Sequence, residues 1–219
     1  MPKDKIVIIG AGGFGREVCR WVMDMYQGRK DVVEGFYDDN PRTLEKFPDL
    51  ELSVIGNTAF SEARQDVLFV CSIGNVENRE RLFMKIKKLG GRFLTVIHPS
   101  AIMSPNCRIG EGAIIGPGVV ISERADIGKN AVLNIGVICG HDVIVGAHSN
   151  ICPGVNINGE VEIKPRVFIG SSAVITPRAV IPEDCDVSAG SVVYKKSDLK
   201  SGMCLHGNPA KLFPKMRKH

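Results

Sequence analysis

Aromatic side chains, excess charge of one sign and long apolar runs are all scarce in this sequence of 219 residues. Lys and Arg number 28, and Asp and Glu number 24, so the net charge of +4 is too small to indicate a nucleic-acid-binding protein. No apolar run approaches the roughly 20 residues of a membrane-spanning helix. These absences favour an ordinary globular chain, in agreement with its 44% of apolar residues.

The seven cysteines are scattered along the chain with no CxxC pair. An odd number of thiols without metal-ligand spacing predicts reduced, inert cysteines, no metal site and a cytoplasmic protein. The first residues, MPKDK, lead directly into a strand-like IVIIG rather than into the longer apolar segment of a signal peptide. We therefore do not expect secretion.

A period of six residues runs through the second half of the sequence. Every sixth residue from Ile97 to Val193 is apolar, seventeen in a row. At 44% apolar content this happens by chance about once in a million, so the repeat is a strong architectural signal. A second register, two residues earlier, holds small or β-branched residues from Ala113 to Ala179. Glycine often follows the apolar position, at 110, 116, 128, 140, 146 and 170.

This repeat predicts a triangular parallel β-helix. Each hexapeptide forms one short strand and one corner, with the apolar residue pointing inward and Gly, Asn or Pro permitting the backbone of the corner. Three hexapeptides complete one coil, and coils stack at the ~4.8 Å spacing of strands. Residues i and i+18 therefore lie above one another, and residues 97 to about 196 provide five to six coils.

The first half alternates strands and helices, which predicts a small Rossmann-like parallel sheet. Strands are expected at residues 5–10, 32–37, 66–72 and 92–97, and helices at 16–26 and 75–89. Asn75 is placed to cap the second helix, which Gly90 and Gly91 end. We place the domain boundary at 1–94 and 95–219, where the repeats begin.

The loop after the first strand, GAGGFG, has GxGxxG spacing at Gly10, Gly12 and Gly15. Glycines let a phosphate approach the backbone, and the N-terminus of a helix attracts its charge. Asp38, at the end of the second strand, is placed to bind a ribose hydroxyl. Only about 95 residues precede the repeats, half of a dinucleotide fold, so the UDP of a nucleotide sugar fits better than NAD. A tight turn without a ligand would have the same glycine spacing.

Together and in order, the motifs IVIIGAGGFGREV, GFYDDN, SVIG, IGN, HPSA, GHDVIVGAHSNICPG and GNPAKLF resemble the bacterial sugar acyltransferases over nearly the whole chain. Members of that family include UDP-4-amino-sugar N-acetyltransferases and sialic acid O-acetyltransferases. The resemblance implies a left-handed β-helix, a homotrimer, and acetyl-CoA bound between neighbouring β-helices. It places the nucleotide sugar against Gly10, Gly12, Gly13, Phe14, Asp38, Asp39, Gly74 and Asn75.

Acetyl transfer needs a base that removes a proton from the attacking amine or hydroxyl. His141 follows the inward Cys139 by two residues, which puts it outside the core, and Asp142 is placed to orient its imidazole. The resemblance assigns the same two roles to this pair. One coil above His141 stands Gly159, whose N–H is placed to stabilise the thioester oxygen. A solvated corner histidine and an ordinary corner glycine would give the same spacing without a catalytic role.

Five further residues are candidates for contacts to the acceptor sugar or the cofactor. His148 is a candidate for acceptor binding or for a surface facing a partner subunit, and Asn134 for acceptor binding or a plain corner asparagine. Ser171 and Ala189, 18 residues apart, offer a path of small residues for a pantetheine arm. Lys211, in GNPAK, resembles a residue near the CoA nucleotide.

The sequence therefore predicts an acetyl-CoA-dependent N-acetyltransferase in which the 4-amino group of a UDP-4-amino-4,6-dideoxy sugar attacks directly. O-acetylation of a sialic acid or another sugar is a second hypothesis, although the intact glycine loop favours a UDP-sugar. A β-helix scaffold without catalysis is a third, and an NAD-dependent enzyme, which depends on the GxGxxG spacing alone, is a fourth. The His141–Asp142 pair, with a glycine one coil above it, argues against a scaffold.

Overall fold

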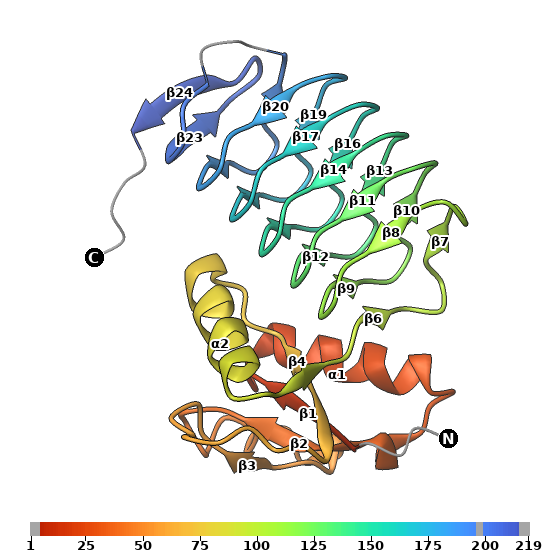
Figure 1. The fold of residues 1–219 in the computed structure, drawn as a ribbon, viewed down its shortest axis with the longest axis vertical. Helices are drawn as coiled ribbons and strands as arrows, with labels where there is room; N and C mark the ends of the chain where they lie inside the picture. The colour runs from red at the N-terminus through yellow and green to blue at the C-terminus, as the bar shows by residue number, and fades with distance from the viewer. Residues whose placement is uncertain (1–4, 196–198, 215–219) are drawn as a thin grey trace. The chain divides into compact units, whose positions relative to one another are not determined.

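The computed structural model describes residues 5–195 and 199–214, which belong to two compact units, Met1–Pro99 and Ser100–His219 (Figure 1). The first is an α/β unit and the second is a parallel β-helix, as the sequence predicts. In the part of the chain that the structure describes, no helix has both the length and the apolar character needed to cross a membrane.

The α/β unit contains a parallel five-stranded sheet in the order β3-β2-β1-β4-β5. Residues 6–9 of its central strand are apolar and fully buried, because a strand in the middle of a parallel sheet is covered on both faces. The elements are β1 (Lys5–Ile9), α1 (Gly13–Met25), β2 (Val33–Tyr37), β3 (Val54–Gly56), β4 (Val67–Cys71), α2 (Val76–Lys88) and β5 (Arg92–Phe93), with 3₁₀ turns at Lys30–Val32 and Pro48–Leu50.

Two boundaries and one strand differ from the sequence prediction. Helix α1 begins at Gly13 instead of residue 16, so the end of the glycine loop already forms its first turn. The strand expected at 92–97 is divided into β5 and β6 (Val96–Ile97). Strand β3, which the sequence analysis did not predict, is an edge strand of three residues, none of them fully buried. The predicted cap of α2 is confirmed, since the Asn75 side chain accepts a hydrogen bond from the Asn78 N–H.

The β-helix has three faces of two-residue strands, each paired in parallel with the strand 18 residues away. The first face holds β7 (Ile102–Met103), β10 (Val120–Ile121), β13 (Ile138–Cys139), β16 (Asn156–Ile157), β19 (Val174–Ile175) and β22 (Val192–Val193). The second holds β8 (Arg108–Ile109), β11 (Asp126–Ile127), β14 (Ile144–Val145), β17 (Glu162–Ile163) and β20 (Val180–Ile181). The third holds β9 (Ile114–Ile115), β12 (Val132–Leu133), β15 (Asn150–Ile151), β18 (Phe168–Ile169), β21 (Asp186–Val187) and β23 (Met203–His206), with β24 (Lys211–Pro214) antiparallel to β23.

The predicted inward register is confirmed for most of its length. Every sixth residue from Ile115 to Val193 is at most 1% exposed, and so is the second register from Ala113 to Ala179. Ile97, Met103 and Ile109 are only half-buried. Met103 and Ile109 lie in β7 and β8, which end their sheets and have a neighbouring coil on one side only.

The glycines that follow the inward residues do not have the role predicted from the sequence. The prediction is that they permit the backbone of the corner, but none of the six has a positive φ. A Cβ on Gly140 would lie 2.7 Å from the Gly159 nitrogen, and one on Gly146 would lie 2.4 Å from the backbone of Lys164. These glycines are therefore required because adjacent coils approach each other closely.

Left-handed backbone occurs two residues later, and it recurs at every sixth residue from 112 to 190. The Asp142 corner consists of Arg124, Asp142, Glu160 and Arg178, the His148 corner of Gly112, Asn130, His148, Arg166 and Asp184, and the Gly136 corner of Gly118, Gly136, Gly154, Ser172 and Gly190. Only the Gly136 corner uses glycine consistently. The other two hold side chains in a conformation that costs L-residues free energy, and those side chains form ladders along the coils.

Candidate active site

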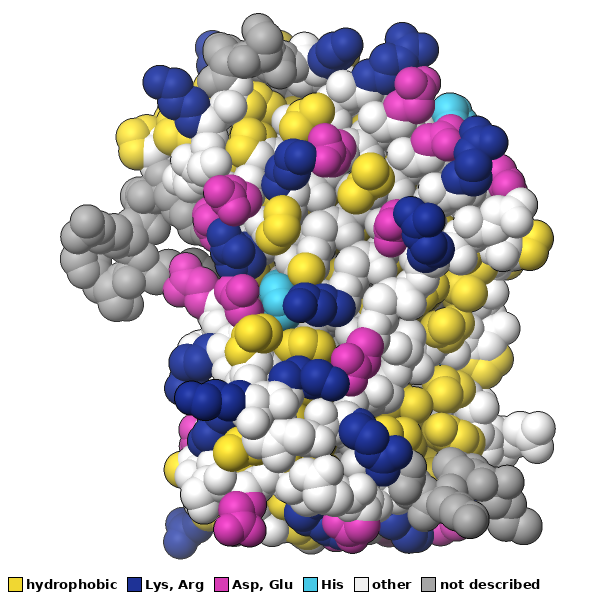
Figure 2. Space-filling view, viewed as in Figure 1, with side chains coloured by type: hydrophobic (Ala, Val, Ile, Leu, Met, Phe, Trp, Pro, Cys, Tyr) yellow, Lys and Arg dark blue, Asp and Glu magenta, His cyan; other side chains and the backbone are white. Residues whose placement is uncertain are grey.

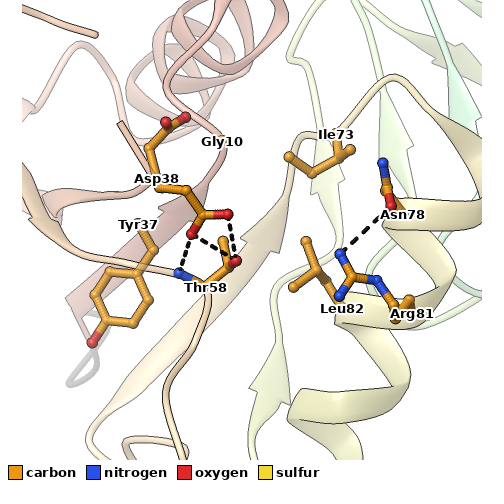
Figure 3. Close-up of a pocket in the computed structure, with 9 residues that line it drawn as sticks. Gly10, Tyr37, Asp38, Thr58, Ile73, Asn78, Arg81 and Leu82 are labelled. Carbon is orange, nitrogen blue, oxygen red and sulfur yellow. Dashed lines mark hydrogen bonds between the residues drawn. The ribbon is translucent and has the colours of Figure 1, made fainter. Parts of the chain in front are cut away.

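The sheet of the α/β unit has its switch point between β1 and β4. The chain leaves β1 toward β2 and β3 and later returns on the other side through β4 and β5, and ligands of such sheets bind beyond the carboxyl ends of the strands at this point. A cavity of about 170 Å³ lies there (Figure 3). It is lined by Gly10, Tyr37, Asp38, Asp39, Thr58, Ile73, Asn78, Arg81 and Leu82.

The glycines of the GxGxxG loop divide into two kinds. Gly10 has φ of +94°, and a Cβ on Gly15 would lie 1.8 Å from the Gly10 carbonyl oxygen, so both are required by the strand-to-helix turn. Gly12 and Gly13 have ordinary backbone, and nothing lies within 4 Å of the Cβ that each lacks. The turn does not require these two, and their missing side chains leave open space beside the loop.

The N-terminus of α1 adjoins this open space. Its N-cap is Gly12, which offers no side chain to the first N–H groups, and its first turn contains no acidic residue. Such N–H groups and the positive end of the helix dipole bind anions such as phosphates. By contrast, α2 is capped by Asn75 and has Glu77 in its first turn. These features favour anion binding at the N-terminus of α1 over that of α2.

Asp38 and Asp39 line the cavity, and both carboxylates already have partners. Asp38 accepts a hydrogen bond from the Ala11 N–H at 2.7 Å and another from the Asn40 N–H at 2.9 Å, so it also fixes the glycine loop. Asp39 accepts from the N–H and the hydroxyl of Thr58 at 2.9 and 2.8 Å. These bonds, the backbone one foremost, hold the pKa of Asp39 below its usual range.

Sequence reasoning missed three polar residues of this cavity: Thr58, Asn78 and Arg81. Thr58 lies on the side of Tyr37 and Asp38, whereas Asn78 and Arg81 project from α2 on the opposite side (Figure 3). The Arg81 guanidinium donates to the Asn78 amide oxygen at 3.5 Å. The spacing of Asn78 and Arg81 on an exposed helix face resembles that of ordinary solvated side chains, so only the fold reveals them.

Besides Gly12 and Gly13, three predicted substrate residues of the α/β unit do not line the cavity. Phe14 packs edge-on against Trp21 of the same helix, with ring centroids 6.0 Å apart. The side chain of Asn75 serves as the cap of α2. Gly74 is exposed beside it, in the loop between β4 and α2.

In the β-helix, His141 lies at the Asp142 corner with its side chain 56% exposed. Its Nδ1 atom lies 2.9 Å from Oδ2 of Asp142, as the predicted pair requires. The same carboxylate accepts hydrogen bonds from Arg124, and these bonds foremost, followed by the one to His141, lower the pKa of Asp142 to about 2. The Nε2 atom of His141 makes no hydrogen bond to the described residues and faces Gly159.

The predicted stacking of Gly159 over His141 is present in the structure. Strand β13 pairs with β16 in the register Cys139↔Ile157, and the Glu160 N–H donates to the His141 carbonyl at 2.9 Å. A Cβ on Gly159 would lie 2.5 Å from Nε2 of His141. Among the described residues nothing accepts a hydrogen bond from the Gly159 N–H, so this donor is available beside the imidazole.

The remaining predicted contact residues lie elsewhere in the β-helix. Ser171 and Ala189 stack as predicted, but next to the Gly136 corner, and Asn134 lies at the same corner with its side chain bonded to the following backbone N–H. His148 is 4% exposed and its Nδ1 atom lies 2.9 Å from Nδ2 of Asn130, so it is buried instead of lying on the surface. Lys211 is exposed at the start of β24. Within one chain, Gly159 and the predicted path for the pantetheine arm therefore lie at different corners of the β-helix.

Within residues 5–195 and 199–214, no group of three or more His, Cys, Asp or Glu side chains is arranged to hold a metal ion. All seven cysteines are free, and burial raises the pKa of Cys71 and of Cys139 to about 12. The buried thiols are therefore poor nucleophiles.

Comparison with protein families finds one match in the α/β unit and one at the start of the β-helix. The PglD N-terminal domain family matches residues 5–86, and the bacterial transferase hexapeptide family matches residues 95–123. The UDP-N-acetylbacillosamine N-acetyltransferase of Bacillus subtilis is 32% identical over 114 residues, a stretch that covers only half of this chain and half of that relative.

Two solved structures are similar over nearly the whole chain. PerB from Caulobacter crescentus, in complex with CoA and GDP-perosamine, is 30% identical with a TM-score of 0.84, covering 95% of this chain and 97% of that one. The acetyltransferase domain of PglB from Neisseria gonorrhoeae, in complex with acetyl coenzyme A, is 25% identical with a TM-score of 0.78, covering 96% and 100%. The chain therefore belongs to the family of sugar acetyltransferases that join a PglD N-terminal domain to a hexapeptide-repeat β-helix.

Proposed function

We propose that this protein transfers an acetyl group from acetyl-CoA to the 4-amino group of a UDP-4-amino-4,6-dideoxy sugar. The observation that carries the proposal is the geometry at the Asp142 corner. There an exposed imidazole has one nitrogen fixed by a carboxylate, and its other nitrogen faces a glycine whose N–H has no partner among the described residues. A base beside an unused backbone donor is the arrangement that attack on a thioester requires.

In the proposed reaction the sugar amine attacks the thioester carbonyl carbon, a C–N bond forms, and the C–S bond breaks. His141 accepts the ammonium proton at Nε2 and returns it to the departing thiolate of CoA. Asp142 holds the ring through Nδ1, so that Nε2 is the nitrogen presented to the substrate. The N–H of Gly159 donates to the oxygen that becomes negative during the attack.

The α/β unit would bind the nucleotide. We assign the diphosphate to the N-terminus of α1 and the open space beside Gly12 and Gly13, and the nucleoside to the cavity lined by Asp38. One similar protein is named for a UDP-sugar, and another was solved with GDP-perosamine. We propose uracil as the nucleobase of the substrate, and this is the most specific part of the proposal.

We further propose that the active form is a homotrimer with acetyl-CoA between neighbouring β-helices. The face made by β7, β10, β13, β16, β19 and β22 lies between the Asp142 corner, which carries Gly159, and the Gly136 corner, which adjoins Ser171 and Ala189. Ile102 and Ile138 on this face are 67% and 44% exposed, which suits packing against a second copy. Lys211 would meet a phosphate of the cofactor.

A product assay tests the proposal. Purified protein is incubated with acetyl-CoA and a panel of UDP-, GDP- and dTDP-linked 4-amino sugars and with a sialic acid, and products are identified by mass spectrometry. The expected result is N-acetylation with a UDP-4-amino sugar as the preferred acceptor. If a GDP- or dTDP-linked sugar is preferred, the nucleobase in the proposal is wrong. If the sialic acid is O-acetylated instead, the proposed reaction is wrong. If no acceptor is acetylated, the whole proposal is overturned.

A further inference from the structure

The geometry points to Arg124 as a positioning residue that holds the Asp142 carboxylate and weakens its pull on the His141 proton. This inference rests on the proposed function, because it concerns the base of that reaction. Arg124 lies one coil before Asp142 at the same corner, and no feature of the sequence other than the interval of 18 residues connects the two.

The guanidinium binds the carboxylate as a fork. Nε of Arg124 donates to Oδ1 of Asp142 at 2.7 Å, and Nη2 donates to Oδ2 at 3.2 Å. Oδ2 is also the atom that lies 2.9 Å from Nδ1 of His141. One oxygen is thus shared between a permanent cation and the imidazole, and the planar fork fixes the orientation of the carboxylate.

The backbone holds this arrangement in place. Arg124 and Asp142 both have left-handed φ values, 55° and 57°, and the Asp142 N–H donates to the Glu123 carbonyl at 2.9 Å. The distance between the two side chains is therefore set by the spacing of the coils rather than by chance contact of long surface side chains. Ion pairs fixed in this way retain more of their interaction than mobile surface pairs do.

The fork has a chemical consequence for a general base. A carboxylate beside an imidazole stabilises the protonated ring, but a base must be unprotonated when the substrate arrives. Arg124 offsets part of the negative charge of Asp142 while leaving the oxygen in place to orient Nδ1. The pKa of Asp142, lowered to about 2 by Arg124 foremost and by His141, shows that the carboxylate stays ionised.

The acidic side chains in the coils before and after His141 already have hydrogen-bond partners. Glu123, adjacent to Arg124, accepts hydrogen bonds from Ser104 and Asn106 of the preceding coil. Glu160, in the following coil, accepts from Nε of Arg178 at 3.2 Å. Figure 2 shows the same alternation of Lys or Arg with Asp or Glu over the β-helix. Arg124 is the cation bonded to the carboxylate that contacts His141.

The test is a titration of the His141 C2 proton by NMR in the full-length protein, with its resonance assigned by its loss in His141→Ala. Arg124→Gln is expected to move the midpoint upward by roughly 0.5 to 1 pH unit, the low end for a neighbouring charge because Arg124 is largely exposed. Asp142→Asn is expected to move it downward. Arg124→Lys, which keeps the charge without the fork, should recover most of the wild-type midpoint.

Kinetics provide the second readout. A midpoint raised by that amount lowers kcat at pH 6, relative to kcat at pH 8.5, by at most about three- to tenfold, whereas a merely structural role lowers both equally. Arg108→Gln is the matched control, because Arg108 also pairs with an Asp 18 residues later, Asp126, and both pairs are similarly exposed. Its guanidinium hydrogen-bonds Asp126 and not the His141–Asp142 pair. This variant should leave the midpoint and the pH profile unchanged.

The outcomes separate this inference from the proposed function. An unchanged midpoint in a folded Arg124→Gln protein, or an equal shift in Arg108→Gln, overturns the role of Arg124. A shifted midpoint without a change in the pH–rate profile supports the coupling of Arg124 to His141 and overturns His141 as the base. Melting temperatures of the variants verify that each one is folded.

Discussion

The two units use the same residue, glycine, in different ways. In the α/β unit, Gly10 and Gly15 make a tight turn possible, while Gly12 and Gly13 leave space that no described atom fills. In the β-helix, Gly140 and its equivalents let neighbouring coils approach, while the left-handed corners carry charged side chains such as Asp142. A glycine therefore points to a ligand only where its φ is ordinary and where a Cβ would not clash with a neighbouring atom.

The units also differ in how they bring polar groups together. The α/β unit gathers them at one edge of a sheet, from loops and a helix far apart in sequence. The β-helix gathers many of them by repetition, so that Arg124 pairs with Asp142, Arg166 with Asp184 and Arg178 with Glu160, each 18 residues apart. We infer a division of labour in which the first unit binds the nucleotide and the second carries out the chemistry. Three predictions test that division, and a fourth tests the stability of the first unit.

The largest effect is expected from His141→Ala, which removes the proposed base from the β-helix. Turnover should fall by about 10²- to 10⁴-fold, as is typical of a general base, while binding of the nucleotide sugar persists. Steady-state kinetics and isothermal titration calorimetry measure the two quantities. Because His141 is more than half exposed, the melting temperature should change little. A near-wild-type rate between pH 6 and 8 removes His141 from the mechanism.

Gly159→Ala should have the next largest effect. The new methyl group would lie 2.5 Å from Nε2 of His141, so the ring must move, and turnover should fall about 10-fold or more. Gly159→Pro also deletes the N–H, which is worth roughly 10² to 10³ in rate. In a double-mutant cycle, Gly159→Ala should cost little on top of His141→Ala, because both act on the imidazole. Fully additive losses would mean that the glycine acts independently of the ring.

Gly12→Val tests the α/β unit alone. Its side chain would enter the open space beside the loop, so UDP-sugar binding should weaken by about tenfold or more while acetyl-CoA binding and the melting temperature persist. Gly13→Val should behave in the same way. Gly15→Val is the contrasting variant, since its Cβ would overlap the Gly10 carbonyl and lower the melting temperature by about 5 °C or more. Equal loss of both ligands in Gly12→Val would contradict separate sites.

The smallest effect concerns acid stability. The pKa of Asp39 is held below its usual 3.8 by Thr58, so its ionised form favours the folded state above that pH. The stabilisation is present at pH 5 and is lost as the pH falls below 4, because the unfolded chain then binds the proton more tightly. Asp39→Asn should therefore reduce the loss of melting temperature between pH 5 and 3 by about 2 °C. No difference from wild type would show that the Thr58 bonds do not stabilise the fold.

The sequence was enough to place some residues of the candidate site but not others, and the reasons are physical. The interval of 18 residues placed Gly159 over His141 because every coil has the same length, and the structure has that stacking. Arg124 obeys the same interval, yet its role depends on which atoms of Asp142 it reaches, and a period contains no atomic positions. Arg81 and Thr58 obey no period, and only the folding of the sheet puts them on one cavity.

The sequence by itself determined the β-helix, the face on which each inward residue lies, and the cap of α2, because each follows from local or periodic spacing of residues. The tertiary structure decided which glycines are free of steric requirement, why glycine follows six of the inward positions, and that His148 is buried against Asn130. It also decided that Gly159 and Ser171 lie at different corners of one chain. These features depend on distances between segments remote in sequence, which packing fixes and residue spacing does not encode.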